Sequence, residues 1–272
     1  MNARRVAVVQ LCATEDVAAN IDTSERLCRG AADAGAATIF LPEAFSFIGR
    51  DAGKRRMLEP LPEGGPILDR CRRLAQDTGC HLILGGFHES SADAQRSFNT
   101  CVHVDGRGEV AALYRKIHLF DVSLADGTEL RESDRTLPGT ETVCTDVPFG
   151  RLGLSICYDL RFPYLYQALV DQGAIALTVP SAFTATTGAA HWHTLLRARA
   201  IECQSYVIAP AQHGAHNPRR RSYGHSLIID PWGEVLAEID DGDGFAVADI
   251  DAQRLAQVRR DLPSLSHRRS LE

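Results

Sequence analysis

The sequence predicts an α/β domain in which helices cover a mixed sheet or two stacked sheets. Short apolar runs typical of buried strands alternate with amphipathic stretches along the 272 residues. Some neighbouring runs are joined by turn sequences and indicate hairpins, whereas others are separated by a helix. No Ser/Gly linker, charge block or low-complexity tract divides the pattern, so a single domain spanning residues 1–272 is the simplest organisation.

The first third of the chain predicts strands and helices in alternation. The expected strands are Val6–Leu11, Ala37–Leu41 and His81–Gly85. A helix is expected from about Ile21 to Ala34, with Asn20 as its N-cap and Gly35 as its stop. A second helix is expected to begin at Pro66 and to end at Gly79, because its apolar residues recur on one side.

The remainder of the chain predicts hairpins followed by further strands and helices. The expected hairpins pair Phe98–Val104 with Glu109–Tyr114, and Glu141–Asp146 with Arg151–Ile156. A helix is expected from about Pro163 to Asp171, because proline is favoured in a first helical turn. The later expected elements are strand Ala174–Val179, helix Ala190–Cys203, strands Tyr206–Ala211, Ser226–Asp230, Val235–Ile239 and Phe245–Ile250, and helix Ala252–Asp261.

Composition excludes several classes of protein. Hydrophobic residues make up 44% and charged residues 24%, which excludes a disordered or collagen-like chain. The formal charge of -6 provides no overall basic field for nucleic acid. No apolar run approaches 18 residues, so no membrane span is expected. The short N-terminal apolar run contains Gln10 and is interpreted as a strand rather than as a signal peptide.

Cysteine and histidine usage indicates neither disulfides nor a metal centre. The eight cysteines are widely spaced and form no C-x-x-C pair, so we expect reduced thiols and a cytoplasmic location. His191 and His193 are the most suggestive metal ligands. On a helix they point to different faces, and no cysteine or carboxylate lies near them in sequence, so no metal site is predicted.

Cys157 is the strongest candidate nucleophile. The segment from Gly153 to Pro163 has the pattern of an apolar strand, a sharp exit and a helix start, and Cys157 falls at the junction. A nucleophile there would be exposed on a rigid turn, and the positive end of a following helix would favour its thiolate. A small buried cysteine fits the position equally well, so position and composition leave both interpretations open.

Two charged residues in apolar surroundings could complete a cysteine-based site. Glu43 follows an apolar run, where poor solvation raises the pKa of a carboxyl group towards the range useful for proton transfer. Lys116 lies in the mostly apolar segment 113–120 and could offer a fixed positive charge to an oxyanion. Taken alone, a glutamate that points to water and a snorkelling lysine are the favoured interpretations.

Together these segments resemble the nitrilase, or carbon-nitrogen hydrolase, superfamily. Its three motifs resemble Phe40–Phe45, Tyr114–Asp121 and Cys157–Pro163, in this order. The resemblance extends along nearly the whole chain. Later segments are similar to the deaminated glutathione amidase branch, a close relative of the omega-amidase branch: Pro180–Phe183, Gly188–Trp192, Leu195–Glu202, Ser222–Ser226, Asp230–Gly233 and His267–Arg269.

The resemblance implies a four-layer α-β-β-α sandwich and a Glu–Lys–Cys triad. Cys157 would be the nucleophile and Glu43 the general base. Lys116 and the backbone N–H of Tyr158 would stabilise the oxyanion. The motif Arg131-Glu132-Ser133 matches that of a second supporting glutamate, which makes Glu132 a further candidate catalytic residue. Members of the family commonly pair into dimers or larger assemblies, and the tail at about residues 262–272 is expected at a subunit interface.

The same resemblance suggests which residues contact substrate. Arg161 could bind a carboxylate of an anionic substrate bidentately. In relatives, positions that match Phe183 and Thr187 line the acid pocket, although core packing is an equally good interpretation for Phe183. One position departs from the pattern, because Tyr164 stands where relatives often have glutamate. This change could alter the support around Cys157 or a subunit contact.

The resemblance implies an amidase that hydrolyses deaminated glutathione to α-ketoglutarate and cysteinylglycine through a Cys thioester, a metabolite-repair role. An omega-amidase acting on α-ketoglutaramate is the nearest alternative, followed by a carbamoyl-amide hydrolase or a true nitrilase. A non-catalytic scaffold with the same fold is the alternative from another class, and the presence of all three triad residues argues against it. No cofactor, metal, nucleic acid or membrane partner is implied, only a small amide substrate with anionic groups.

Overall fold

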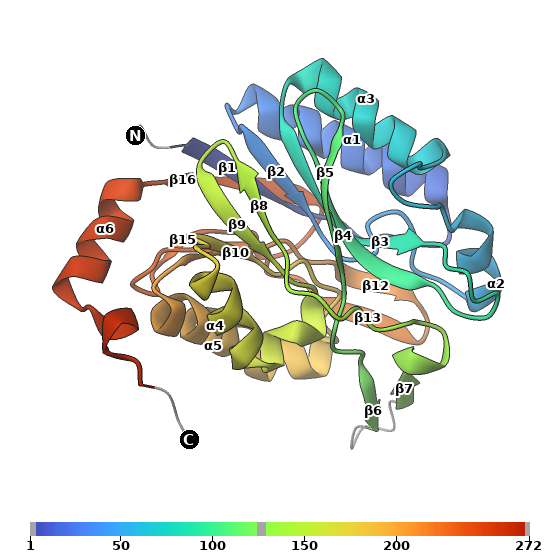
Figure 1. Ribbon diagram of the computed structural model, residues 1–272. Helices are drawn as coiled ribbons and strands as arrows, with labels where there is room; N and C mark the ends of the chain where they lie inside the picture. Colours follow the sequence, from blue (N-terminus) through green and yellow to red (C-terminus); the bar gives the residue numbers. More distant parts are fainter. Residues whose placement is uncertain (1–3, 124–128, 270–272) are drawn as a thin grey trace.

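Two six-stranded sheets form the centre of the protein, and a pair of helices covers the outside of each (Figure 1). The computed structural model describes residues 4–123 and 129–269. The first sheet has the order β16 (Gly244–Ile250), β1 (Arg4–Gln10), β2 (Thr38–Leu41), β3 (His81–Glu89), β4 (Phe98–Val104) and β5 (Val110–Arg115). The second has the order β15 (Val235–Glu238), β14 (Leu227–Ile229), β11 (Tyr206–Ala209), β10 (Ala176–Thr178), β9 (Gly150–Leu154) and β8 (Cys144–Val147).

The helices complete the four layers that the family resemblance implies. Helices α1 (Val17–Asp33) and α3 (Pro66–Thr78) pack on the first sheet, and α4 (Pro163–Asp171) and α5 (Ala185–Cys203) pack on the second (Figure 1). The other helices are α2 (Asp51–Lys54), α6 (Ala252–Asp261) and the 3-10 turns η1 (Arg55–Met57), η2 (Glu132–Asp134), η3 (Cys157–Arg161) and η4 (Ser264–His267). Two small sheets pair β12 (His213–Asn217) with β13 (Arg220–Tyr223), and β6 (Asp121–Ser123) with β7 (Glu129–Arg131).

The first sheet divides its side chains between two hydrophobic cores. In β1, Val6 and Val8 join the cluster that includes residues of the second sheet. Ala7 and Val9 join the cluster formed with α1 and α3. This division follows from the period of two along a strand, which sends alternate side chains to opposite faces. Both faces of the strand are therefore buried, as its continuous apolar sequence predicts.

Parallel and antiparallel pairing are mixed within each sheet, as the sequence predicts. Strands β1, β2 and β3 run parallel and are separated by helices, whereas β3, β4 and β5 follow one another as antiparallel neighbours. In the second sheet β9, β10 and β11 are parallel, and β8 joins β9 as the expected hairpin. The three motifs that resemble the nitrilase superfamily all leave this framework near the ends of its strands, at β2, β5 and β9.

Two expected helix starts are wrong. Helix α1 begins at Val17 and is capped by Asp16, whose carboxylate accepts a hydrogen bond from the Ala19 N–H. Asn20, the expected cap, lies inside the helix, and its side chain ties the backbone of Thr14 and Ser46. The same asparagine side chain can cap a helix or, when buried, hydrogen-bond to the backbone of two loops. The sequence pattern does not distinguish these two roles. Helix α5 also begins five residues before the expected Ala190.

Candidate active site

Loops from both sheets meet around one pocket of about 250 Å³. The pocket lies beyond the ends of β2, β5 and β9, and the N-terminal turn of α5 closes one side. Every candidate residue of the sequence analysis lines it: Glu43, Lys116, Glu132, Cys157, Tyr158, Arg161, Phe183 and Thr187. Residues separated by more than 100 positions in the chain are therefore brought together in one cavity.

Cys157 lies three residues beyond β9, at the first position of η3. Its φ is +48°, in the left-handed region that is uncommon for residues other than glycine. Its N–H bonds to the carbonyl of Pro180 at 3.0 Å, and the Asp159 carboxylate accepts a bond from the N–H of Ile156 at 2.9 Å. These bonds hold a strained turn that points the sulfur into the pocket.

The 3-10 turn η3 follows Cys157 directly, and the expected helix, α4, begins at Pro163 as predicted. Cys157 is therefore not at the N-terminus of an α-helix, and the expected support of its thiolate by a helix is wrong. Burial and the neighbouring Glu43 carboxylate raise the pKa of the Cys157 thiol, and Lys116 only partly offsets them. The sulfur therefore rests as a neutral thiol at neutral pH.

Glu43 follows β2 and is held by three donors. The side-chain amide of Asn99 donates to its Oε1 at 2.9 Å, and the Lys116 Nζ donates to the same oxygen at 3.2 Å. The backbone N–H of Ala182 donates to Oε2 at 2.9 Å. These contacts fix both oxygens of a carboxylate that is only 6% exposed.

The electrostatics of Glu43 differ from the expectation. Burial by itself would raise the pKa of the Glu43 carboxyl, but Lys116 and the hydrogen bonds from Cys157 and Asn99 outweigh it and lower that pKa to about 2. The prediction that the pKa of Glu43 is raised is therefore wrong. It considered Glu43 as an isolated carboxylate in apolar surroundings, whereas the Lys116 ammonium lies 3.2 Å from its Oε1. The glutamate is ionised and ready to accept a proton at neutral pH.

Lys116 lies directly after β5, with a 2% exposed side chain between two carboxylates. Its Nζ lies 3.2 Å from Glu43 Oε1 and 2.8 Å from Glu132 Oε2. Burial would lower the pKa of this lysine, but the two carboxylates outweigh burial and raise it. Lys116 therefore carries a fixed positive charge, and the snorkelling interpretation is wrong because its ammonium points inward.

Glu132 lies in η2, and the structure connects it to the other charged groups. Besides Lys116, it accepts hydrogen bonds from the Asn99 side chain at 3.2 Å and from the Phe120 N–H at 2.8 Å. Asn99 thus bridges both glutamates. The sequence analysis missed Asn99, because an asparagine in the run Phe98–Val104 carries no signal of chemistry beyond its place in a strand.

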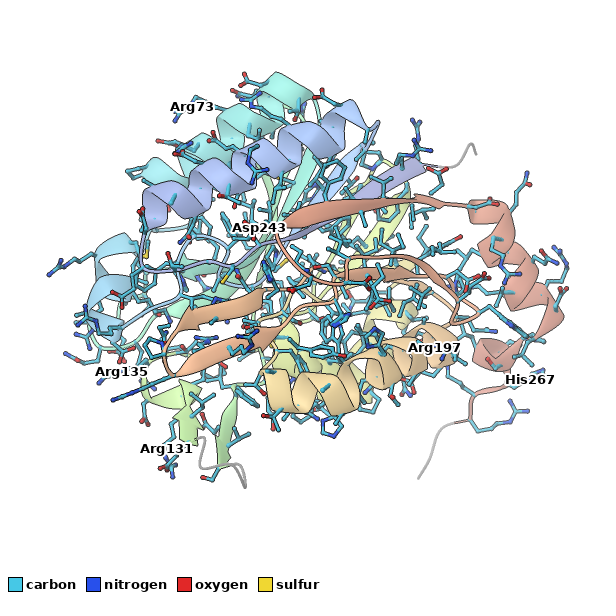
Figure 2. All side chains as sticks on the ribbon, turned by 180° about the vertical axis from the view of Figure 1, so that it is seen from behind. Arg73, Arg131, Arg135, Arg197, Asp243 and His267 are labelled. Carbon is cyan, nitrogen blue, oxygen red and sulfur yellow. The ribbon has the colours of Figure 1, made fainter. Side chains whose placement is uncertain are left out.

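Further cationic side chains line the pocket. Lys54 and Arg220 line it, and in the described part of the chain neither side chain has an acidic hydrogen-bond partner. The Arg161 guanidinium lies over the Phe183 ring, 5.3 Å from its centroid, and its Nη2 is 3.3 Å from His191 Nδ1. Arg131 and Arg135 lie at the rim beside the β6–β7 hairpin (Figure 2).

Tyr164, the departure from the family pattern, is 61% exposed and contacts a network beside the nucleophile. Its hydroxyl lies 2.5 Å from Nε2 of His118, whose Nδ1 lies 2.7 Å from the buried Asp159 carboxylate. Asp159 in turn fixes the Ile156 N–H next to Cys157. Tyr164 therefore supports the Cys157 turn through a hydrogen-bond chain.

A family model described as carbon-nitrogen hydrolase matches residues 5–260. That match covers almost the entire chain. This chain belongs to the carbon-nitrogen hydrolase family. A deaminated glutathione amidase from Bos taurus is 48% identical over 97% of this chain and 81% of the relative.

Two solved structures of this family are also similar. The C. elegans NitFhit protein superposes with a TM-score of 0.91 at 40% identity, covering 99% of this chain and 66% of that longer chain. Saccharomyces cerevisiae Nit3, described as a member of the nitrilase superfamily, gives a TM-score of 0.86 at 29% identity, covering 96% and 94%. The nitrilase-type sandwich expected from the resemblance is thereby confirmed.

Proposed function

We propose that this carbon-nitrogen hydrolase is an amidase that cleaves deaminated glutathione to α-ketoglutarate and cysteinylglycine. The proposal rests on one combination of observations. A buried glutamate, a buried lysine and a cysteine share one open pocket, in a chain 48% identical to a protein named deaminated glutathione amidase. A scaffold protein would have no need for two buried charged groups beside a strained cysteine, because burial of charge is costly.

Acylation begins with Cys157. Its thiol passes its proton to the Glu43 carboxylate while the sulfur attacks the amide carbon. The raised pKa of Cys157 and the lowered pKa of Glu43 mean that a free thiolate is not stored. Proton transfer is therefore coupled to formation of the carbon–sulfur bond. The proton on Glu43 then moves to the amide nitrogen, and cysteinylglycine leaves as the amine.

Two donors stabilise the oxyanion of the tetrahedral intermediate. The Lys116 ammonium offers a full positive charge at the base of the pocket, and the backbone N–H of Tyr158 offers a second bond. Glu132 and Asn99 hold Lys116 and Glu43 in position through hydrogen bonds. A water molecule, deprotonated by Glu43, then attacks the thioester, and α-ketoglutarate is released.

The cationic side chains of the pocket suit a substrate with carboxylates at both ends. Arg161 offers a planar guanidinium for the α-keto acid group, next to the Phe183 ring and Thr187. Lys54 and Arg220 lie on the same pocket and offer two further positive charges for the carboxylate of the glycine residue. A neutral amide of similar size would leave these charges without partners, so the pocket favours anionic amides.

Comparison of two amides tests the substrate. We expect kcat/KM for deaminated glutathione to exceed that for α-ketoglutaramate, with Cys157→Ala as an inactive blank. The larger substrate alone reaches across to the Lys54 and Arg220 side of the pocket. A preference of more than tenfold for α-ketoglutaramate would instead assign the chain to the omega-amidases.

Location and assembly are further parts of the proposal. In the described part of the chain, no helix combines the length and apolar character needed to cross a bilayer. All eight cysteines are free, which supports the cytoplasmic location proposed from their spacing. A homodimer or larger assembly stays a prediction from the family resemblance, as does the expected role of the C-terminal tail, whose last three residues lie outside the described residues.

A further inference from the structure

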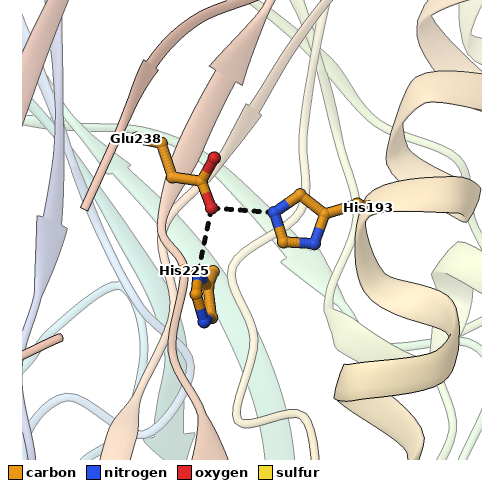
Figure 3. Close-up of side chains that lie close together, drawn as sticks. All are labelled: His193, His225 and Glu238. Atoms are coloured by element: carbon orange, nitrogen blue, oxygen red, sulfur yellow. Dashed lines mark hydrogen bonds and ion pairs between the residues drawn. The ribbon is translucent and has the colours of Figure 1, made fainter. Parts of the chain in front are cut away.

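Three side chains outside the active-site pocket converge on one point (Figure 3). His193 comes from α5, His225 from the loop between β13 and β14, and Glu238 from the end of β15. His193 Nε2 lies 2.8 Å from Glu238 Oε1, and His225 Nδ1 lies 2.9 Å from the same oxygen. The three potential ligand atoms all lie within 4.8 Å of one another. The sequence analysis predicted no metal site here, because His191 and His193 point to different faces of a helix and no cysteine or carboxylate lies near them in sequence.

We propose that His193, His225 and Glu238 bind one divalent transition-metal ion, with Zn²⁺ as the best-fitting candidate. Two imidazole nitrogens and one carboxylate oxygen suit zinc, copper or nickel better than magnesium or calcium. In a tetrahedral zinc site with bonds of about 2.1 Å, neighbouring ligand atoms are about 3.4 Å apart. The two N–O separations of 2.8 and 2.9 Å lie about half an ångström below that value, and all three ligand atoms lie within 4.8 Å of one another, so side-chain adjustments reach this geometry.

The backbone holds the second histidine in place. His225 has a φ of +59°, and its carbonyl accepts a hydrogen bond of 2.8 Å from Nε1 of the buried Trp192. Its ring also packs against Tyr223, with 4.4 Å between the ring centroids. Because Trp192 precedes His193 on α5, this bond ties the two histidine-bearing segments together. Folding therefore already restricts the positions of the two histidines, which lowers the entropic cost of binding a metal ion.

Access and protonation also fit a metal site. The side chains of His193, His225 and Glu238 are 35%, 27% and 27% exposed, so an ion can enter from solvent and water can fill its remaining position. Without metal, each ring nitrogen donates its hydrogen to the Glu238 carboxylate, which accepts only. On binding, each ring moves that proton to its other nitrogen and presents a lone pair, so the site needs no net proton loss from neutral histidines.

The proposed ion would be structural rather than catalytic. None of the three ligands lines the active-site pocket. The ion would clamp α5 to the loop that precedes β14 and to the end of β15, and α5 carries Thr187 of the pocket wall in its first turn. Because the unfolded chain does not bring these ligands together, metal binding would stabilise the folded state by mass action.

Zinc titration of the chelator-treated full chain tests this proposal. We expect one Zn²⁺ per chain by calorimetry and a higher Tm with Zn²⁺ than without it. His193→Ala should abolish this binding, and Glu238→Gln should weaken it by at least about tenfold, as loss of a metal ligand generally does. His267→Ala serves as the matched control, since it removes an exposed histidine outside the cluster.

Cys157 is a competing zinc ligand and needs its own control. The Cys157→Ala variant should retain the same stoichiometry and affinity. Co²⁺ binding adds a spectroscopic check, because ligation by nitrogen and oxygen gives d–d bands without a thiolate charge-transfer band. Absence of Zn²⁺ binding, or binding that survives both His193→Ala and Glu238→Gln, would overturn the proposal, as would a thiolate band. The result is independent of amidase activity.

Discussion

Lys116 is the residue whose surroundings matter most to the proposed chemistry, because two buried carboxylates share its charge. We expect Lys116→Met to lower kcat by about 10²–10³-fold, the usual effect of losing one oxyanion donor. The same change should lower the free energy of unfolding by about 3–5 kcal/mol, because Glu43 and Glu132 lose their buried partner. Steady-state kinetics and urea denaturation measure the two effects separately.

The double variant Lys116→Met/Glu132→Gln is the control. Removal of one carboxylate charge should recover part of the stability but none of the activity. If this variant instead recovers turnover, the role of Lys116 would be structural, and the assignment of the oxyanion donor would be wrong.

The pH dependence of kcat/KM follows from two opposite shifts. The active form carries a Glu43 carboxylate and a Cys157 thiol. The pKa of Glu43 is lowered to about 2 and the pKa of Cys157 is raised, so neither group changes its charge in the physiological range. We expect kcat/KM to stay level from about pH 5 to about pH 8.5, between the ordinary pKa values of these side chains. A steep limb near pH 7 that disappears in Glu43→Gln or Cys157→Ser would contradict these protonation states.

At the residue scale, the sequence could identify the triad only through its long motifs. Considered alone, Glu43 and Lys116 favour a structural interpretation, and the position of Cys157 leaves the structural and the catalytic interpretation equally open. Their place in one pocket depends on which strand ends lie side by side, and sequence spacing does not encode that. Asn99 and Lys54 show the limit, because their roles arise solely from neighbours that folding brings to them.

At the scale of elements, a bulge in β3 shapes the site. The pairing of β3 with β4 shifts register between Leu84 and Phe87, where two glycines lie. Gly86 has a φ of +61°, and a Cβ there would lie 2.6 Å from Glu43 Cγ and 2.9 Å from Asn99 Oδ1. The bulge therefore lets the strand approach the base and its hydrogen-bond partner.

We expect Gly86→Ala to displace Glu43 and Asn99, and so to lower kcat/KM sharply. It should also destabilise the fold by about 1–3 kcal/mol through overpacking. Gly79→Ala is the matched control, because Gly79 has a similar φ of +67° but nothing within 4 Å of a Cβ. That control should cost about 1 kcal/mol of backbone strain and leave kcat/KM unchanged. Equal kinetic effects of the two changes would show that the close contact at Gly86 does not matter.

Helix boundaries were predictable where they are marked by a residue type that has a single structural role at a helix end. Helices α3 and α4 follow the sequence expectation closely, because a Pro in the first turn marks the start of each. Helix α6 also has its expected bounds, and the Asp251 carboxylate caps its start. The start of α1 was not predictable from Asn20, since its amide serves two loops instead of a helix end. The strand order within the two sheets was likewise not predictable, because the sequence pattern does not fix which strands are neighbours.

For the whole molecule, the buried thiols predict how stability depends on pH. Burial raises the pKa of all eight cysteines in the folded state. A raised folded-state pKa means that the stability contribution is complete below the unfolded value of about 8.5 and is lost as pH rises above it. Each thiol can contribute up to about 1.4 kcal/mol per pH unit to this loss.

We therefore expect the free energy of unfolding, measured by urea denaturation in reducing buffer, to fall steeply between about pH 8.5 and pH 9.5. Cys101→Ala should make the slope shallower by the share of one thiol, because burial alone raises the pKa of Cys101. A free energy that is constant across this range would contradict the picture of protonated buried thiols.

The proposed chemistry requires Cys157 to form a covalent bond to the substrate. Rapid acid quenching during turnover of deaminated glutathione, followed by mass spectrometry of peptides, tests it most directly. We expect an α-ketoglutaryl thioester on Cys157 and no such adduct in Cys157→Ala. An acyl group on a different residue, or turnover that persists in Cys157→Ala, would contradict it.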